Sequence, residues 1–220
     1  GVAEGMSIST GFSMGSNTTT INVGSVIAAS AGGTNNQFHV RKLDILSETG
    51  ALHAGRHAVE AIGNSSAGGL LLGVTSTSAT VGNTESVVSQ LINGTKIGTA
   101  DRYSGQISVS SSSNVDQRAE SNAAAGGLIG AGEARATANS NTTSNALIGD
   151  VTVYAGQMSV DAGGNSYSNA TTEAGSGGLV AASGARPLVD MDANVKAQVS
   201  DGADINIHEQ QYYEDLYAAA

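Results

Sequence analysis

Two histidines and a glutamate, His53, His57 and Glu60, come closest in type and spacing to a metal site. On a helix, histidines four residues apart lie on one face and can bind zinc together. The periodicity of this segment is that of a strand, however, which separates the two imidazoles by about 13 Å. Two similar eight-residue stretches, Ser104–Ser111 and Ala155–Ala162, have Ile107 and Met158 at the position that His57 holds in Ala54–Ala61. We therefore interpret His57 as a replacement for an inward aliphatic side chain, and we predict no metal site.

Oxygen ligands suited to calcium occur in short acidic stretches. They are Asp190-Met191-Asp192, Asp201-Gly202-Ala203-Asp204, and Asp161 with Asn165. Calcium needs about six to eight converging oxygens, and the tandem glycine-aspartate repeats of calcium-binding solenoids do not occur in this sequence. We therefore expect solvated turns and no cofactor, with an incidental calcium ion as the alternative.

Groups that could act in catalysis are dispersed along the chain. Polysaccharide cleavage, which many β-helices perform, needs paired carboxylates, or a base beside a basic cluster, on one face. The arginines are spread over the whole length, at Arg41, Arg56, Arg102, Arg118, Arg135 and Arg186. No spacing of serine, histidine and aspartate suggests a triad. We predict no catalytic residues and no enzymatic activity.

The aromatic residues are concentrated near the C-terminus. Half of the six tyrosines, Tyr212, Tyr213 and Tyr217, lie between His208 and Tyr217. Two interpretations stay open for residues 208–220. The segment is either a short helical cap over an open sheet end or an interface with a partner.

The composition excludes two classes of partner. The chain of 220 residues has 9 basic and 19 acidic residues, a net charge of −10. Nucleic acid binding needs clustered lysine and arginine, so no nucleic acid partner is expected. No apolar run approaches the roughly 20 residues of a membrane span, so no membrane insertion is expected. The chain begins at Gly1 without a signal sequence, and we interpret it as a processed protein or an excised segment.

Alternation with a period of two is the main signal for secondary structure. Ile107 and Val109 alternate with polar residues, as do Met158 and Val160. Such runs predict short strands of about four to six residues separated by Gly, Asn, Asp and Ser. No helical stripe of useful length occurs before residue 208, so the sequence predicts an all-β fold.

An internal repeat organises these strands. An eight-residue phrase occurs at Ala54–Ala61, Ser104–Ser111 and Ala155–Ala162. A Gly-Gly-Leu-aliphatic corner follows each phrase, at Gly68–Leu71, Gly126–Ile129 and Gly177–Val180. The last two phrases and the last two corners are both 51 residues apart. A fixed period of this size is typical of stacked supersecondary units.

A right-handed parallel β-helix, or β-solenoid, explains the repeat better than a sandwich, because hairpin dipeptides are scarce. With coils of about 17–25 residues, the 51-residue repeat would contain two or three coils, and the chain about ten. We expect each Gly-Gly pair to form a corner after which Leu70, Leu128 or Leu179 turns into the core.

The repeat divides the chain into three parts. Residues 1–36 form irregular Thr/Ser/Gly-rich first coils, 37–207 form the repeat solenoid, and 208–220 form the cap or interface. The interval from Gly68 to Gly126 is seven residues longer than the next one. We place this insertion in a loop at Gly82–Gly98.

The repeat resembles the repeat regions of bacterial filamentous-haemagglutinin and leukotoxin-type adhesins. The residues that carry the resemblance are Gly126–Ile129, Ala134–Ala138, Ile148–Asp150 and Ala155–Ala162, with recurrences at Gly177–Val180, Val189–Lys196 and Asp201–Ile205. The resemblance covers about residues 40–207. It implies a parallel β-helix shaft that is secreted by a two-partner route and displayed on the bacterial cell surface.

The leading hypothesis is therefore an extracellular structural or adhesive segment, whose partners are glycans of a host or neighbouring cell. A second hypothesis is a filament subunit that stacks end to end with copies of itself. A β-helix that binds or cleaves polysaccharide ranks last.

Overall fold

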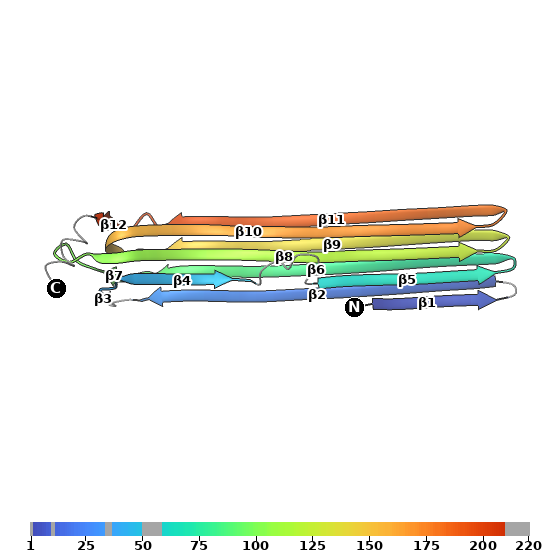
Figure 1. Ribbon diagram of the computed structural model, residues 1–220, viewed down its shortest axis with the longest axis horizontal. Helices are drawn as coiled ribbons and strands as arrows, with labels where there is room; N and C mark the ends of the chain where they lie inside the picture. The colour runs from blue at the N-terminus through green and yellow to red at the C-terminus, as the bar shows by residue number, and fades with distance from the viewer. Residues whose placement is uncertain (1, 10–11, 34–36, 50–58, 210–220) are drawn as a thin grey trace.

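The computed structural model describes residues 2–9, 12–33, 37–49 and 59–209. Nearly all of these residues lie in β-strands, and the elements of the described ranges include no helix (Figure 1). The strands are β1 (Val2–Ser9), β2 (Phe12–Gly32), β3 (Gln37–Phe38), β4 (Lys42–Glu48), β5 (Val59–Gly69), β6 (Leu72–Ile92), β7 (Lys96–Ile97), β8 (Ser104–Gly126), β9 (Ile129–Ile148), β10 (Thr152–Gly177), β11 (Val180–Val199) and β12 (Asp204–Ile207).

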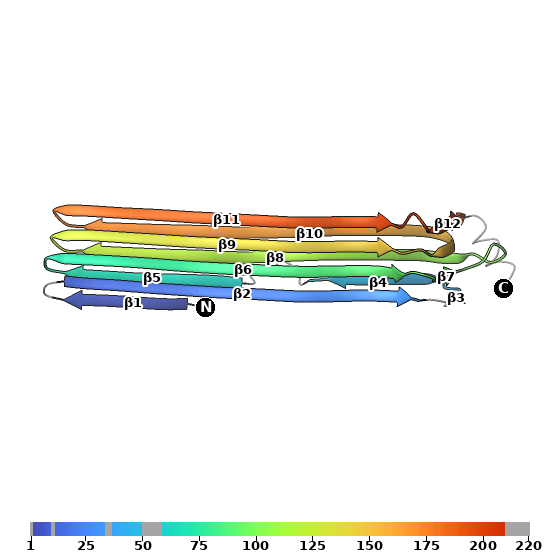
Figure 2. The same ribbon diagram turned by 180° about the vertical axis from the view of Figure 1, so that it is seen from behind.

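The chain alternates between two parallel sheets. The first sheet contains β1, β5, β8 and β10 together with the short strands, and the second has the order β11-β9-β6-β2. A strand of the first sheet is followed by a strand of the second, so the pairs β5–β6, β8–β9 and β10–β11 each form one layer. The ribbon views from front and back show these layers stacked on one another (Figures 1 and 2).

The 51-residue repeat is one layer of this stack. Gln157 pairs with Gln106 and Val180 pairs with Ile129, and both pairs are separated by one repeat length. The expectation of coils of about 17–25 residues, and of about ten coils, is therefore wrong. A strand of 20 residues is about 66 Å long, whereas four strands stack over only about 15 Å. The molecule is thus longest along its strands.

The strands run on through residues that usually end them. β8 has 23 residues and β10 has 26, in place of the four to six expected. Some of their polar side chains are satisfied by the neighbouring layer, as where Asn165 Nδ2 donates to Asn114 Oδ1 at 3.1 Å, and others by the opposite sheet, as where Ser113 Oγ donates to Glu85 Oε2 at 2.8 Å. These contacts satisfy polar groups that would otherwise favour turns.

The interior contains two apolar clusters of different character. The first surrounds Ile107 and Val109, which are fully buried as predicted, and Met158 and Val160 pack against it. The second consists of alanines and one valine. Its buried members are Ala61, Ala79, Val81, Ala119, Ala136 and Ala138. Such small residues indicate a narrow space between the sheets.

Hydrogen bonds that cross between the sheets show how closely they approach. The Ser89 hydroxyl, in the second sheet, donates to the Ser110 carbonyl of the first at 2.6 Å. Thr77 Oγ1 donates to the Asn122 carbonyl at 3.1 Å. A β-carbon added to Gly130 would lie 2.6 Å from the Gly177 carbonyl oxygen, which is inside van der Waals contact. The sheets are therefore in direct contact near the corner that joins them.

The Gly-Gly-Leu corners turn differently from the prediction. Gly127 and Gly178 have φ of 155° and 152°, and a side chain at Gly178 would collide with the Gly127 carbonyl of the adjacent corner. The leucines after them do not enter the core. Leu128 is 46% and Leu179 is 85% exposed, because the closely packed sheets leave no space for a large side chain between them.

The first layer also corrects the predicted alignment of the eight-residue phrase. Leu43 and Ile45 of β4 pair with Ile107 and Val109 of β8, and Ala61 pairs with Ala119. The phrase Ala54–Ala61 is therefore not the counterpart of Ser104–Ser111, and Leu43, not His57, occupies the position beside Ile107. Paired residues are further apart in sequence for β4 and β8 than for β5 and β8. The reason is that the segment between β4 and β5 has six more residues than the corresponding segment of β8.

Most of the insertion predicted at Gly82–Gly98 lies further along the chain, after β7. β6 pairs with β9 at a constant offset from Leu72 to Leu91. Beyond it, Ser104 pairs with Ala155 at an offset that is smaller by six, so six extra residues lie within 92–103. One more extra residue lies at the corner between β5 and β6. Gly68 and Leu72 are four residues apart, whereas their partners Gly126 and Ile129 are only three apart.

The residues before 37 contribute two strands to the stack. β1 pairs with β5 and β2 pairs with β6, and the same sequence offset is kept throughout both pairs. The pairing of β1 and β2 is therefore regular, whereas the composition of residues 1–36 predicted irregular first coils.

Candidate interaction surfaces

The structure does not bring the candidate metal ligands together. His53 and His57 lie outside the described residues. Glu60 is on the outer face of the first sheet, 3.3 Å from the Arg118 guanidinium. Across the described ranges, no group of three or more histidine, aspartate or glutamate side chains could hold a metal ion.

The acidic stretches considered for calcium are also separate. Asp161 and Asn165 are four residues apart on β10, about 13 Å along an extended strand. Asp204 begins β12 and accepts a hydrogen bond from Asn206 Nδ2 at 3.0 Å. Asp190 and Asp192 belong to the opposite sheet, so the three stretches form no common site.

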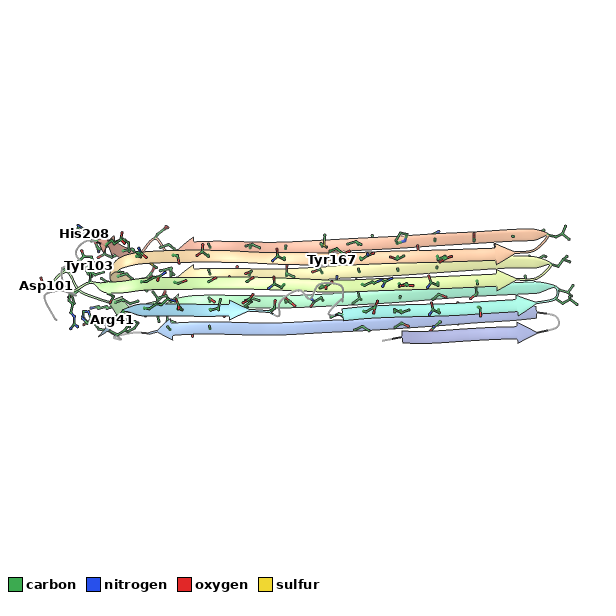
Figure 3. The ribbon with its side chains drawn as sticks, viewed as in Figure 1. Arg41, Asp101, Tyr103, Tyr167 and His208 are labelled. Carbon is green, nitrogen blue, oxygen red and sulfur yellow. The ribbon has the colours of Figure 1, made fainter. Side chains whose placement is uncertain are left out.

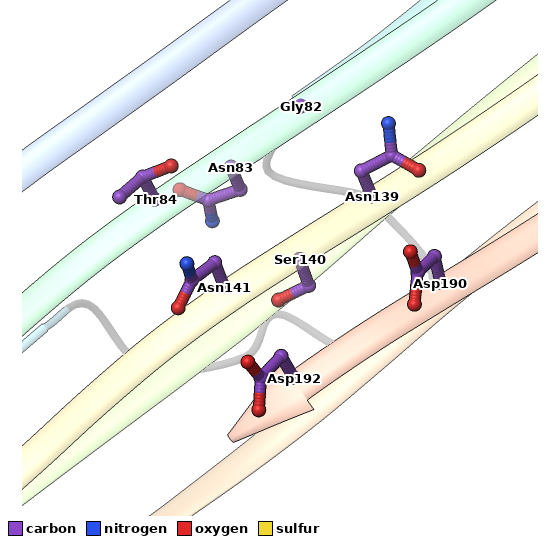
Figure 4. A pocket seen from close by; sticks show the side chains of 8 residues that line it. All are labelled: Gly82, Asn83, Thr84, Asn139, Ser140, Asn141, Asp190 and Asp192. Atoms are coloured by element: carbon purple, nitrogen blue, oxygen red, sulfur yellow. The ribbon is translucent and has the colours of Figure 1, made fainter. Parts of the chain in front are cut away.

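Asp190 and Asp192 do contribute to a polar hollow on the outer face of the second sheet (Figure 4). Sheet pairing aligns Gly82 with Asn139 and Asp190, and Thr84 with Asn141 and Asp192. The absence of a side chain at Gly82 helps to open a space of about 530 Å³. The residues that line it are Gly82, Asn83, Thr84, Asn139, Ser140, Asn141, Asp190 and Asp192.

The chemistry of this hollow suits a ligand rich in hydroxyl groups. Carboxylates accept hydrogen bonds, and amides both donate and accept them. These residues form no linear motif, and only the alignment of strands in neighbouring layers brings them together. The signal was present, since one repeat length separates Asn139 from Asp190 and also Asn141 from Asp192.

Glu85, which belongs to no recognisable sequence motif, places a carboxylate between the sheets. Glu85 Oε2 accepts hydrogen bonds from Thr49 Oγ1 at 2.9 Å and from Ser113 Oγ at 2.8 Å. Glu85 Oε1 accepts one from Asn83 Nδ2 at 3.3 Å. Neutral donors on three different strands or strand ends thus satisfy the carboxylate. This group joins the layers and presents no second carboxylate for acid–base chemistry.

An outward ion pair on β9 has a measurable consequence. Arg135 Nε donates to Glu133 Oε1 at 2.7 Å. This hydrogen bond and the charge of Arg135, with a smaller contribution from Arg186, lower the pKa of Glu133 from its ordinary 4.5. A lowered pKa stabilises the folded state above the pKa of the unfolded chain, and the contribution disappears as pH falls through the folded value.

We expect Arg135→Ala to raise the pKa of Glu133 toward 4.5, because the largest cause of its depression is removed. NMR titration of the Glu133 side-chain carboxyl measures this directly. Arg186→Ala should raise the pKa by less, since Arg186 acts only through its charge. An unchanged Glu133 pKa in Arg135→Ala would show that the ion pair does not form in solution.

Tyr103 and His208 lie at the end of the molecule away from the Gly-Gly-Leu corners, whereas Tyr167 lies along β10 (Figure 3). The Tyr103 ring centroid is 5.6 Å from that of Tyr154 and 6.0 Å from that of His208, both edge-on. The His208 amide donates to the Ala155 carbonyl at 2.9 Å and so extends the pairing of β12 with β10 by one residue. Tyr212, Tyr213 and Tyr217, the predicted interface, lie outside the described residues.

The second sheet has an open edge at each end of its strand order. In the part of the chain that the structure describes, no strand pairs with the far side of β11 or of β2. Val189, Met191, Val195 and Val199 lie at inward positions of β11 but are 41–54% exposed. Their counterparts in β6 and β9, such as Val87 and Ile148, are buried. The inside of the last layer is thus uncovered.

Comparisons with known proteins identify no relative of this chain. The described residues include no helical segment with the length and apolar character of a membrane span. No model of a known protein family matches the sequence, and comparison with curated proteins and with solved structures finds no match.

Proposed function

We propose that this chain forms a flattened, right-handed parallel β-solenoid whose function is structural: a rigid extracellular shaft on a bacterial cell surface. The observation that carries the proposal is the unbroken register between layers. β8 and β10 pair at a constant offset of one repeat length from Gln106 to Gly126, and β9 and β11 do so along their full lengths. Ladders of this length resist bending of each layer relative to the next.

The outer faces support display in an aqueous environment. Serine, threonine and asparagine occupy many outward positions, while others are buried between the sheets, and the net charge of −10 favours solubility. The resemblance to filamentous-haemagglutinin repeats supplies the proposed location and secretion route. Adhesion would use the polar hollow at Asp190 and Asp192, whose carboxylates can accept hydrogen bonds from glycan hydroxyls.

Solution scattering combined with hydrogen exchange tests the structural role. We expect a particle whose longest dimension is about 66 Å or more, set by strand length. Backbone amides of β8 and β9 should be protected from exchange, because they lie between paired strands on both sides. A compact particle, or rapid exchange throughout β8, would contradict the proposal.

Glycan binding is tested separately on an array of polysaccharides. We expect binding to be lost in the double variant Asp190→Asn, Asp192→Asn. The variant Asp161→Asn, on the opposite sheet, is the matched control and should bind like the native chain. Equal binding by both variants would exclude the hollow as the adhesive site.

A second function, a filament subunit, is favoured by the open edges of β2 and β11. It differs from the shaft in one respect, which is that layers continue between chains. A polysaccharide-cleaving β-helix has no support beyond the glycan binding that the hollow at Asp190 and Asp192 could provide.

A further inference from the structure

We propose that the open edge of β11 is a docking site for a second copy of this chain, which pairs its β2 edge in parallel with it. This inference rests on the proposed solenoid architecture and deepens it by naming the partner, the polarity and the interface. Four observations on the second sheet carry it.

The first observation is that the edges of β11 and β2 both lack a paired strand among the described residues and have partly exposed inward side chains. β11 presents inward aliphatic side chains that are about half exposed, and β2 has Ile21, Ala29 and Ala31 only partly buried against the two core clusters. A strand laid along either edge would bury these side chains and pair the free backbone groups at once. Open strand edges of this kind are templates for pairing with another chain.

The second observation is the match in length and direction. β2 has 21 residues and β11 has 20, and all strands of the second sheet are parallel and in register. A second copy placed with β2 above β11 therefore continues the order in the same sense in which β6 follows β2. The contact joins two different surfaces of the chain, so each added copy leaves a new β11 edge free.

The third observation is charge. β2 contains no charged residue. β11 contains Arg186, Asp190, Asp192 and Lys196, whose charges cancel. These four residues fall at outward positions, so a second chain meets no unpaired charge on the inside. Pro187 removes one backbone donor from β11 and leaves the rest of the ladder.

The fourth observation is size. A ladder of 20 residues is about 66 Å long, and sheets pack about 10 Å apart. The footprint is therefore about 700 Å² on each copy, or about 1,300 Å² in total. Specific protein–protein interfaces begin at about this value. Two copies therefore gain enough contact to associate without help from a third protein.

The experiment uses two blocked variants and their matched controls. Val195→Lys places a charge at an inward position of β11, and Ala29→Lys does so on β2. Both positions are partly exposed, so the lysine can extend to solvent in the single chain. The controls Asn194→Lys and Ala28→Lys add the same charge one residue away, on the exposed outer face.

Sedimentation velocity over a concentration series gives the readout, with far-UV circular dichroism as the check on folding. We expect the native chain and both controls to form polymers that grow with concentration. Each blocked variant alone should sediment as a monomer. An equimolar mixture of the two should form dimers and nothing larger, because only one compatible pair of edges remains.

Three results would overturn the proposal. They are a native chain that stays monomeric at all concentrations, blocked variants that polymerise, or a mixture that forms no dimers. A folded, elongated native monomer would reject the docking while leaving the structural role intact. If Val195→Lys loses its β-sheet signal, Val199→Lys, at the next inward position but one, provides the same block.

Discussion

Replacing Gly130 by alanine is expected to destabilise the protein by about 3 kcal/mol, the upper range for overpacking a closely packed interior. The new β-carbon would lie 2.6 Å from the Gly177 carbonyl oxygen and 3.5 Å from that of Ala125. Both oxygens belong to backbone in the ladders of the opposite sheet, so neither can rotate away. Relief would require the two sheets to separate near the corner. Equilibrium denaturation followed by circular dichroism measures the loss.

Gly177→Ala is the matched control, because a β-carbon there would have no heavy atom within 4 Å. We expect this variant to be neutral, or more stable by up to about 1 kcal/mol through a less flexible unfolded chain. The same contrast is expected one layer away. Gly73→Ala should be destabilising, because its β-carbon would overlap the Gly126 carbonyl, whereas Gly126→Ala should not, because a β-carbon there has open space. Equal stabilities for Gly130→Ala and Gly177→Ala would show that the sheets are further apart than the structure indicates.

The second large effect is expected at Ile107. Ile107→Ala should lower the free energy of unfolding by about 2–5 kcal/mol, because the side chain is fully buried in the larger apolar cluster and its removal leaves a cavity. Leu43 and Met158 occupy the neighbouring positions on either side, and their places in adjacent strands limit how far they can collapse into the space.

Leu179→Ala provides the contrast, since it also removes aliphatic carbons but at a side chain that is 85% exposed. We expect a change within about 0.5 kcal/mol, as for ordinary surface positions. Urea denaturation of both variants under the same conditions makes the comparison. A loss at Leu179 as large as that at Ile107 would restore the original prediction that the corner leucines face the core.

Much of the fold could be predicted from local pattern. Alternation identified the inward side of β8 through Ile107 and Val109, and the 51-residue spacing matched the pairing of Gln106 with Gln157. The number of strands in each repeat could not be predicted, because serine, asparagine and glycine inside a strand look the same as those in a turn. Only the partner residue in the next layer shows which role they have, as Asn114 and Asn165 do.

The candidate surfaces were less predictable than the fold. The polar hollow depends on residues from three strands, and aspartates in one sequence stretch, such as Asp190 and Asp192, reveal nothing about the asparagines beside them. The phrase at Ala54–Ala61 misled the alignment because small residues recur often by chance in a chain with 30 glycines. The larger side chains of Leu43 and Ile45 match β8, since the core must be filled.

Local pattern in the sequence is enough to show that this protein is built from strands, that the strands repeat in register, and that alternate residues face inward. These properties depend on neighbours in the chain, through backbone geometry and the two sides of an extended strand. That one repeat is one layer, that Leu179 points to solvent and that Glu85 is held between sheets become visible only in the packed molecule. Those outcomes depend on the distance between two sheets, which is set by contacts between residues far apart in the chain.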